Sequence, residues 1–232
     1  MTESIFQKPD CSICNGLGYE LVVLDGDTVI EDCVCMVELK RQIGLFKSNI
    51  PKRYWNFDIE NIDTWRVEEN QENYDVVNEY INNLRDNITK GRGFWIISAP
   101  GLGKSTILCS ILKKSHNLGY RPYYIKASKI IKMKFEALRD PVAARLINYI
   151  VEDADIVAID EMEKVYLASE DSLARNMFFE FISDVYDARK SVLISSNKSR
   201  KDSLKGYRTD VQDRLLMLPI IKLRGESARK DW

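Results

Sequence analysis

The sequence predicts an α/β protein in which a parallel β-sheet is covered by helices on both faces. Segments with strand character alternate with segments of helical periodicity between residues 70 and 223. A glycine-containing loop joins the apolar run Phe94–Ile97 to a helical pattern that begins at Lys104. A second apolar run, Ile156–Ile159, is followed by two adjacent carboxylates. Strands that are linked through helices run parallel, so both runs should end at the same edge of one sheet.

The N-terminal part of the chain has a different pattern. Two expected strands, 19–24 and 28–33, are joined at Asp25-Gly26-Asp27, a sequence typical of hairpin turns. A short basic helix is expected at 37–47, and a proline and aromatic cluster at 49–57 indicates an extended segment. We therefore expect a small module, residues 1–47, before a larger domain, residues 48–232.

The larger domain is expected to begin with a helix at 70–89, where apolar residues recur at helical spacing up to Gly91-Arg92-Gly93. Each later element is bounded by glycine, proline or polar residues. The expected strands are 94–97, 122–126, 156–159, 191–196 and 219–223, and the expected helices are 104–118, 128–150 (interrupted at Asp140-Pro141), 172–187 and 208–218.

Charge is unevenly distributed along the 232 residues, whose net charge is −1. Residues 189–232 contain 12 Lys or Arg and 5 Asp or Glu. Residues 121–145 contain 7 Lys or Arg and 2 Asp or Glu. Basic patches on a nearly neutral protein favour contact with nucleic acid or phosphate. No apolar run approaches the about 20 residues that a membrane helix needs, and the N-terminus lacks the form of a signal peptide. We expect a soluble, cytoplasmic protein without membrane contact.

The loop after the first apolar run has the pattern of a phosphate-binding loop, the Walker A element. Its glycines let backbone N–H groups approach a phosphate chain, and the next helix presents the positive end of its dipole. We expect Lys104 to reach the β and γ phosphates and the Ser105 hydroxyl to ligate Mg²⁺. Ser98 departs from the pattern, which has glycine there. The predicted ATP-binding residues are Ser98, Pro100, Gly101, Leu102, Gly103, Lys104, Ser105 and Thr106.

The carboxylates after the second apolar run fit a Walker B element. Asp160 lies 56 positions after Lys104, which leaves room for a β-α-β-α-β arrangement. Carboxylates at the carboxyl edge of a parallel sheet are costly unless they face a metal and water. We expect Asp160 to hold Mg²⁺ together with Ser105, and Glu161 to polarise the attacking water. Asn197, at the end of another expected strand, would orient that water or the γ-phosphate.

Four cysteines in the N-terminal module have the spacing of a metal site. Cys11 and Cys14 form a C-x2-C pair, and Cys33 and Cys35 form a C-x-C pair 18 residues later. Four thiolates complete a tetrahedral Zn²⁺ site and leave no position for water, so the zinc would be structural. The alternatives are a redox pair, for which the surrounding βαβ context is missing, and four free thiols.

Taken together, these motifs resemble the AAA+ ATPases of the DnaC/DnaI helicase-loader and IstB-like group. Ile50-Pro51-Lys52-Arg53-Tyr54 resembles the start of that group's ATPase domain. Asp213-Arg214-Leu215 resembles its "DRL" element, and Gly225-Glu226-Ser227-Ala228-Arg229 resembles its terminal "GESYR". The cysteines resemble the zinc module of DnaI-type loaders. The resemblance implies a P-loop AAA+ domain with no C-terminal lid domain.

The resemblance also implies a site shared between subunits. Arg214 would act as an arginine finger on the ATP of a neighbour, and Arg229 is a second candidate for phosphate contact. Such head-to-tail contacts build a ring or a spiral, which can present a basic segment repeatedly to one DNA strand. The candidate DNA contacts are Lys126, Lys129, Lys132 and Lys134, although the solvated face of an amphipathic helix explains these lysines equally well.

The function implied by the resemblance is that of an ATPase that loads a replicative helicase onto single-stranded DNA during replication initiation, with ATP, Mg²⁺ and Zn²⁺ as cofactors. Two alternatives remain. One is an IstB-like transposition ATPase that binds duplex DNA. The other is an adaptor that binds ATP, hydrolyses it negligibly and contacts a partner through the zinc module.

Overall fold

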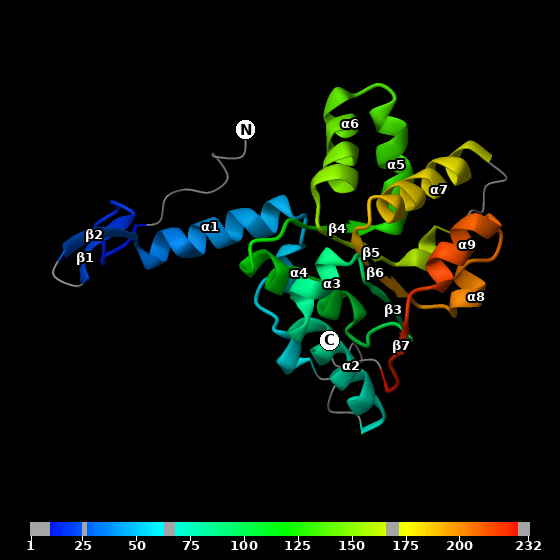
Figure 1. Ribbon diagram of the computed structural model, residues 1–232, viewed down its shortest axis with the longest axis horizontal. Coiled ribbons are helices and arrows are strands. Elements are labelled where there is room, and N and C mark those ends of the chain that lie inside the picture. The colour runs from blue at the N-terminus through cyan, green and yellow to red at the C-terminus, as the bar shows by residue number, and fades with distance from the viewer. Residues whose placement is uncertain (1–9, 25–26, 63–67, 166–171, 227–232) are drawn as a thin grey trace. The chain divides into compact units, whose positions relative to one another are not determined.

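The computed structural model describes residues 10–24, 27–62, 68–165 and 172–226. The chain divides into two compact units, Met1–Ser48 and Asn49–Trp232, and each is described by itself (Figure 1). No helix in the part of the chain that the structure describes is long and apolar enough to span a bilayer.

The first unit contains a β-hairpin followed by a helix. Strands β1 (Tyr19–Leu24) and β2 (Asp27–Asp32) pair antiparallel, and helix α1 (Val34–Lys47) follows directly. The Cys33 N–H donates to the Gly18 carbonyl at 3.0 Å, which closes the open end of the hairpin. Helix α1 begins three residues before the expected start at residue 37, because the N–H groups of Met36 and Val37 already donate to the Cys33 carbonyl, at 2.8 and 3.1 Å.

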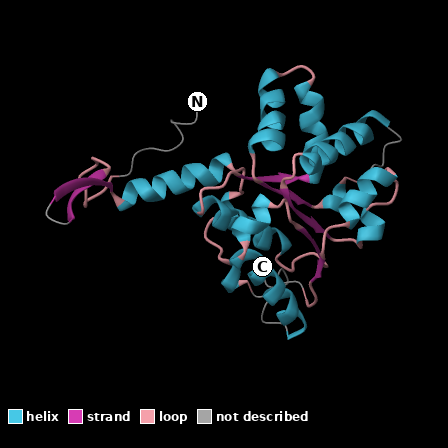
Figure 2. Cartoon of the chain, viewed as in Figure 1, coloured by secondary structure: helices cyan, strands magenta, loops and turns pink. Residues whose placement is uncertain are grey.

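The second unit is built on a five-stranded sheet in the order β4-β5-β6-β3-β7, drawn in magenta in Figure 2. Every neighbouring pair in this sheet is parallel. The prediction of a parallel sheet is therefore confirmed. The strands are β3 (Phe94–Ile97), β4 (Pro122–Lys126), β5 (Ile156–Asp160), β6 (Ser191–Ser196) and β7 (Ile220–Lys222).

Helices cover both faces of this sheet. They are α2 (Gln71–Asn82), α3 (Leu84–Thr89), α4 (Lys104–Asn117), α5 (Ala127–Ala137), α6 (Pro141–Asn148), α7 (Ser172–Asp187), α8 (Arg200–Ser203) and α9 (Thr209–Leu216). Helices α3 and α4 pack on one face, and α5, α7 and α9 enclose the main apolar core on the other (Figure 1).

The alternation of side chains along β5 shows how the sheet serves both the core and the site. Val157 and Ile159 are fully buried in the core, against Phe178 and Phe179 of α7. Because side chains alternate along a strand, Asp160 and Ala158 lie on the opposite face from Val157 and Ile159, and Asp160 contacts α4 there. One strand thus supplies both the core and an acidic group.

The helix expected at 70–89 is broken at Asn83, which separates α2 from α3. Side-chain amides provide the reason: Asn83 donates to the Glu79 carbonyl at 3.1 Å, and Asn87 donates to the Tyr80 carbonyl at 2.9 Å. Such bonds compete with the regular helical pattern. The first turn of α2 is joined to the sheet edge, since Asn73 donates to the Lys222 carbonyl at 3.1 Å.

The interruption expected within 128–150 separates α5 from α6. The Asp140 side chain caps α6 by accepting the Val142 N–H at 2.8 Å, and Pro141 occupies the first turn. A π-helical turn, Tyr149–Asp153, then leads into β5. Helix α8 was not expected. The Ser199 hydroxyl caps it by accepting the Asp202 N–H at 3.1 Å.

Candidate functional site

The loop between β3 and α4 has the backbone geometry that phosphate binding requires. Gly101 and Gly103 have φ values of 88° and 76°, the left-handed region that favours glycine. Gly103 is the N-cap of α4 and leaves the N–H groups of the first turn without a side-chain cap. These donors and the helix dipole make the turn an anion-binding position.

Lys104 lies inside this loop and is 8% exposed. Its Nζ atom lies 3.0 Å from the Ser98 carbonyl oxygen, 2.9 Å from the Ala99 carbonyl oxygen and 3.0 Å from the Ser98 hydroxyl. The serine that departs from the Walker A pattern therefore contributes an acceptor that glycine lacks. The ammonium group is positioned where a phosphate chain would replace these acceptors.

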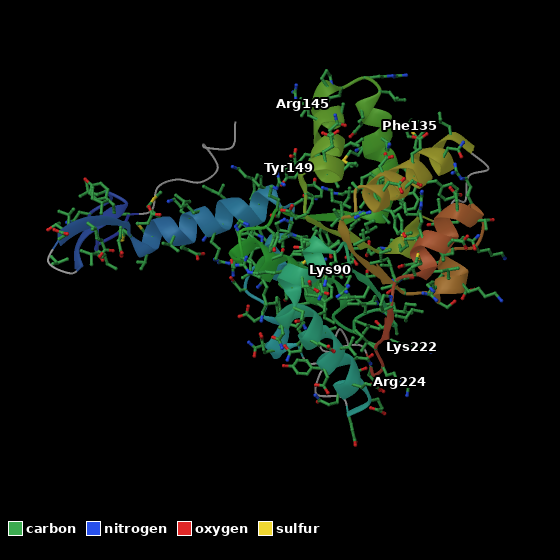
Figure 3. The ribbon with its side chains drawn as sticks, in the orientation of Figure 1. Lys90, Phe135, Arg145, Tyr149, Lys222 and Arg224 are labelled. Atoms are coloured by element: carbon green, nitrogen blue, oxygen red, sulfur yellow. The ribbon has the colours of Figure 1, made fainter. Side chains whose placement is uncertain are left out.

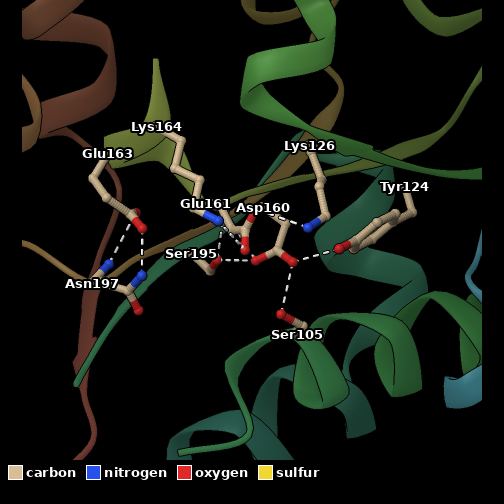
Figure 4. A network of polar contacts seen from close by, with 9 residues as sticks. All are labelled: Ser105, Tyr124, Lys126, Asp160, Glu161, Glu163, Lys164, Ser195 and Asn197. Carbon is tan, nitrogen blue, oxygen red and sulfur yellow. Dashed lines mark hydrogen bonds and ion pairs between the residues drawn. The ribbon is translucent and has the colours of Figure 1, made fainter. Parts of the chain in front are cut away.

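The Asp160 carboxylate is 1% exposed and lies beside the first turn of α4. The Ser105 hydroxyl donates to it at 2.7 Å, and the hydroxyls of Tyr124 and Ser195 also donate to it (Figure 4). Burial, and then the charge of Asp160, raises the pKa of the Tyr124 hydroxyl, which therefore remains a donor. A carboxylate next to a hydroxyl is an oxygen-donor pair that suits Mg²⁺, so Asp160 and Ser105 fit that ion.

Glu161 follows in a left-handed backbone conformation, with a φ of 59°. Residues in this conformation are uncommon outside glycine and asparagine and cluster at functional sites. Its carboxylate pairs with Lys126 and Lys164, both at 2.9 Å (Figure 4). Partial burial raises the pKa of Glu161, but the hydrogen bonds from the two lysines outweigh it and hold that pKa below its usual value. The carboxylate is thus ionised and engaged in two ion pairs.

Asn197 lies at the end of β6, on the other side of the carboxylates from α4 (Figure 4). Its backbone N–H donates to Glu163 at 3.0 Å, and its side-chain amide donates to the other oxygen of the same carboxylate. Glu163 therefore fixes the orientation of the amide.

Asp160, Glu161 and Asn197 line one pocket of about 620 Å³ together with the loop and helix residues Pro100, Gly101, Gly103, Lys104, Ser105 and Thr106. The predicted residues Ser98 and Leu102 do not line it. Its second wall comes from the segment between residues 53 and 62, whose contribution the sequence did not predict. Lys113 of α4 holds this segment by donating to the Trp55 carbonyl at 3.0 Å and to the Phe57 carbonyl. The pocket residues that were not predicted from the sequence are Arg53, Tyr54, Phe57, Asn61, Ile62, Lys164 and Ser195. The proline and aromatic cluster at 49–57 is the sequence feature that indicates the first three of them.

The first unit brings its four cysteines together. Their Sγ atoms lie within 4.8 Å of one another, with Cys11 and Cys33 at 3.8 Å and Cys14 and Cys35 at 3.6 Å. Four sulfur atoms bound to zinc at about 2.3 Å lie about 3.8 Å apart, so the cluster fits a tetrahedral zinc. The Gly18 N–H donates to Cys14 and lowers its pKa to about 7. The fifth cysteine is buried within α4 and is a packing residue.

Comparison with known proteins identifies the family. The model of the bacterial DnaA ATPase domain matches residues 54–218, which include the whole pocket apart from Arg53. The chain belongs to the bacterial DnaA ATPase-domain family. A comparison with curated protein sequences finds no match.

Solved structures share the fold of this DnaA-family domain. A replication initiator DnaA bound to AMPPCP and single-stranded DNA has a TM-score of 0.61, at 20% identity over 76% of this chain and 51% of that chain. The DnaC helicase loader has a TM-score of 0.62, at 19% identity over 75% of this chain and 100% of that chain. DnaI has a TM-score of 0.60, at 13% identity over 77% of this chain and 94% of that chain. The predicted AAA+ fold and its resemblance to the DnaC/DnaI group are confirmed. The chain spans about half the length of the DnaA structure.

Arg214 of the DnaA-family domain does not line the pocket that contains Lys104. It pairs with Asp187 at 3.1 Å, and its guanidinium lies 5.4 Å from the centre of the Tyr186 ring. It lines a different pocket of about 710 Å³ at the other end of the sheet. The second arginine candidate, Arg229, lies outside the described residues.

The four candidate DNA-binding lysines do not form one open surface in this domain. Lys126 pairs with Glu161, which lines the pocket. The Lys134 side chain is 16% exposed, and its Nζ atom lies 3.7 Å from Glu180 and 3.6 Å from Asp184 of α7. The remaining two are exposed: Lys129, and Lys132, which pairs with Glu136 at 3.6 Å.

Proposed function

We propose that this DnaA-family protein is an ATP-dependent loader that delivers a replicative helicase onto single-stranded DNA. The observation that carries this proposal is the convergence of Lys104, Ser105, Asp160 and Glu161 on one pocket with an aromatic wall. The likeness of the fold to the DnaC helicase loader and to DnaI supports the choice of this function within the family.

The main polar and aromatic groups of the pocket are assigned the following roles in binding and hydrolysing ATP. Lys104 and the first N–H groups of α4 bind the phosphate chain, and Tyr54 and Phe57 offer an apolar surface to the base. Ser105 and Asp160 would hold Mg²⁺, which when bound would supply positive charge beside the phosphates. Glu161 polarises the water, and Asn197 orients it. Because Glu161 is paired with two lysines, hydrolysis requires that at least one pair opens.

Arg214 is proposed to complete the pocket of a neighbouring subunit. The proposal is supported by the place of Arg214, which lines a different pocket from Lys104 of the same chain, as an arginine that acts on a neighbour would. A head-to-tail contact of this kind repeats along a spiral. Lys129 and Lys132 are the lysines on α5 that such a spiral could present to the DNA backbone. Loading would take place in the cytoplasm.

The first unit is proposed to bind zinc through its four cysteines and to contact the helicase. Two other functions remain candidates. A transposition ATPase would use the same pocket on duplex DNA. An adaptor with negligible hydrolysis is favoured by one observation, the pairing of Glu161 with Lys126 and Lys164.

A loading assay tests the proposal. Purified chain, ATP and the replicative helicase of the same organism are mixed with circular single-stranded DNA that is coated with single-strand-binding protein. The helicase should become bound to the DNA with wild-type chain and not with Lys104→Ala. Transfer at equal rates with and without the chain would contradict the proposal. ATP-dependent activation of a transposase on duplex DNA would favour the second candidate.

A further inference from the structure

The hairpin of the first unit has one apolar face that is exposed. Leu21 and Ile30 lie directly opposite each other across the two strands, and Tyr19 and Val23 lie two positions from Leu21 on the same face. The exposed fractions are 67% for Leu21, 70% for Ile30, 42% for Tyr19 and 67% for Val23. Soluble proteins expose single apolar residues commonly, but a continuous row on one sheet face indicates an interaction site.

The net charge of the first unit restricts what can bind this face. Residues 9–39 contain seven acidic residues and no Lys or Arg. On the apolar face itself, Asp32 lies opposite Tyr19 and pairs with Lys40, whereas Glu20 and Glu31 lie on the opposite face of the same hairpin. An acidic unit repels nucleic acid, anionic lipid and a second copy of itself. The complementary occupant is a protein surface with an apolar stripe and a net positive charge.

The cysteine cluster makes this face rigid before any partner binds. A two-stranded hairpin is marginally stable in water by itself. Here, Cys33 follows β2 directly, its N–H donates to the Gly18 carbonyl, and the Gly18 N–H donates to Cys14. The cysteines therefore hold the start of β1 and the end of β2 together at the open end of the hairpin. A face that is ordered in advance loses less conformational entropy on binding.

We propose that the Tyr19, Leu21, Val23 and Ile30 face is a docking surface for a basic, apolar-striped surface of another protein. This inference deepens the proposed function, since it rests on the contact between the first unit and the helicase. It names the face of the unit that makes the contact and the chemistry of the partner that the face accepts.

A photo-crosslinking experiment in cells of the source organism tests which molecule covers the face. The full chain carries p-benzoylphenylalanine in place of Leu21 or, as the control, in place of Glu31, which is exposed on the opposite face of the hairpin. Zinc content is measured for both proteins, so that only folded first units are compared. An adduct with another protein is expected from position 21 and not from position 31.

The captured protein is then purified and titrated with the chain. Leu21→Ser/Ile30→Ser should weaken binding at least tenfold, and added salt should weaken it further. Leu138→Ser is the matched control, because Leu138 is an equally exposed leucine, at 67%, in the second unit. This variant should bind as the wild type does.

The outcomes separate this inference from the proposed function. Capture of the replicative helicase, with the expected loss in the double variant, supports both. Capture of a different protein with the same loss supports the docking surface and contradicts the helicase contact. Adducts with nucleic acid, with a second copy or within the chain, equal adducts from both positions, no adduct, or unchanged affinity of the double variant would each overturn the docking surface.

Discussion

At the scale of single residues, the pocket combines groups that the sequence identified with groups that it did not. Lys104 and Asp160 were predictable because each occurs in a motif beside a buried strand. The departure at Ser98 has a structural explanation, since its hydroxyl contacts Lys104 at 3.0 Å. Tyr124 was not predictable as a site residue, because the sequence of β4 has only the pattern of an ordinary buried strand. Only the sheet register brings it to Asp160.

The contact between Tyr124 and Asp160 gives a prediction for stability. Tyr124→Phe removes one donor from a buried carboxylate, which should lower the free energy of unfolding of the second unit by about 1–3 kcal/mol. Tyr123→Phe is the matched control, because Tyr123 lies on the core face of the same strand and should change that energy by less than about 1 kcal/mol. Urea denaturation measures both. Equal losses in the two variants would show that the contact with Asp160 contributes nothing.

The two lysines beside Glu161 give a prediction for pH dependence. The pKa of Glu161 lies below its ordinary value of 4.5, so this group stabilises the folded state above that pH and loses its contribution as the pH falls through the folded-state pKa. Lys126→Ala/Lys164→Ala should raise the pKa. The Glu161 carboxyl carbon can be titrated by NMR. An unchanged midpoint in the double variant would contradict the ion pairs.

At the scale of elements, periodicity predicted the strands of the large sheet closely because each is a short apolar run with clear boundaries. It predicted helix ends less well. The break at Asn83 depends on side-chain amide bonds to Glu79 and Tyr80, which periodicity does not detect. Helix α8 is too short to have a period, and only its Ser199 cap marks it. The wall from residue 53 to 62 depends on a buried lysine of α4, far away in the sequence.

The first unit gives a prediction at this scale. The wild-type chain should bind about one zinc, and Cys11→Ser should lose it and unfold the hairpin, because so small a unit depends on its metal. The second unit should remain folded. Metal analysis and the NMR signals of residues 19–32 measure these effects, with Cys109→Ser as the control outside the cluster. A hairpin that stays folded without metal would rule out a structural zinc.

At the scale of the whole molecule, the position of Arg214 predicts that one chain lacks a complete catalytic site. Arg214→Ala and Glu161→Gln should each abolish assembly-dependent ATP hydrolysis while ATP binding persists. An equal mixture of the two variants should regain activity in about a quarter of the sites, where an intact Glu161 meets an intact Arg214 from a neighbour. Steady-state ATPase assays of mixed samples measure this. A mixture as inactive as its components would exclude the trans role.

The proposed function depends first on ATP and Mg²⁺ binding in the pocket between the β3–α4 loop and Asp160. Calorimetric titration with a non-hydrolysable ATP analogue measures this binding. The wild type should bind the analogue saturably, Lys104→Ala should not bind it, and Lys90→Ala should bind it as the wild type does, because Lys90 is an exposed lysine paired with Asp86 (Figure 3). Wild-type affinity in a folded Lys104→Ala protein would show that this pocket is not the ATP site.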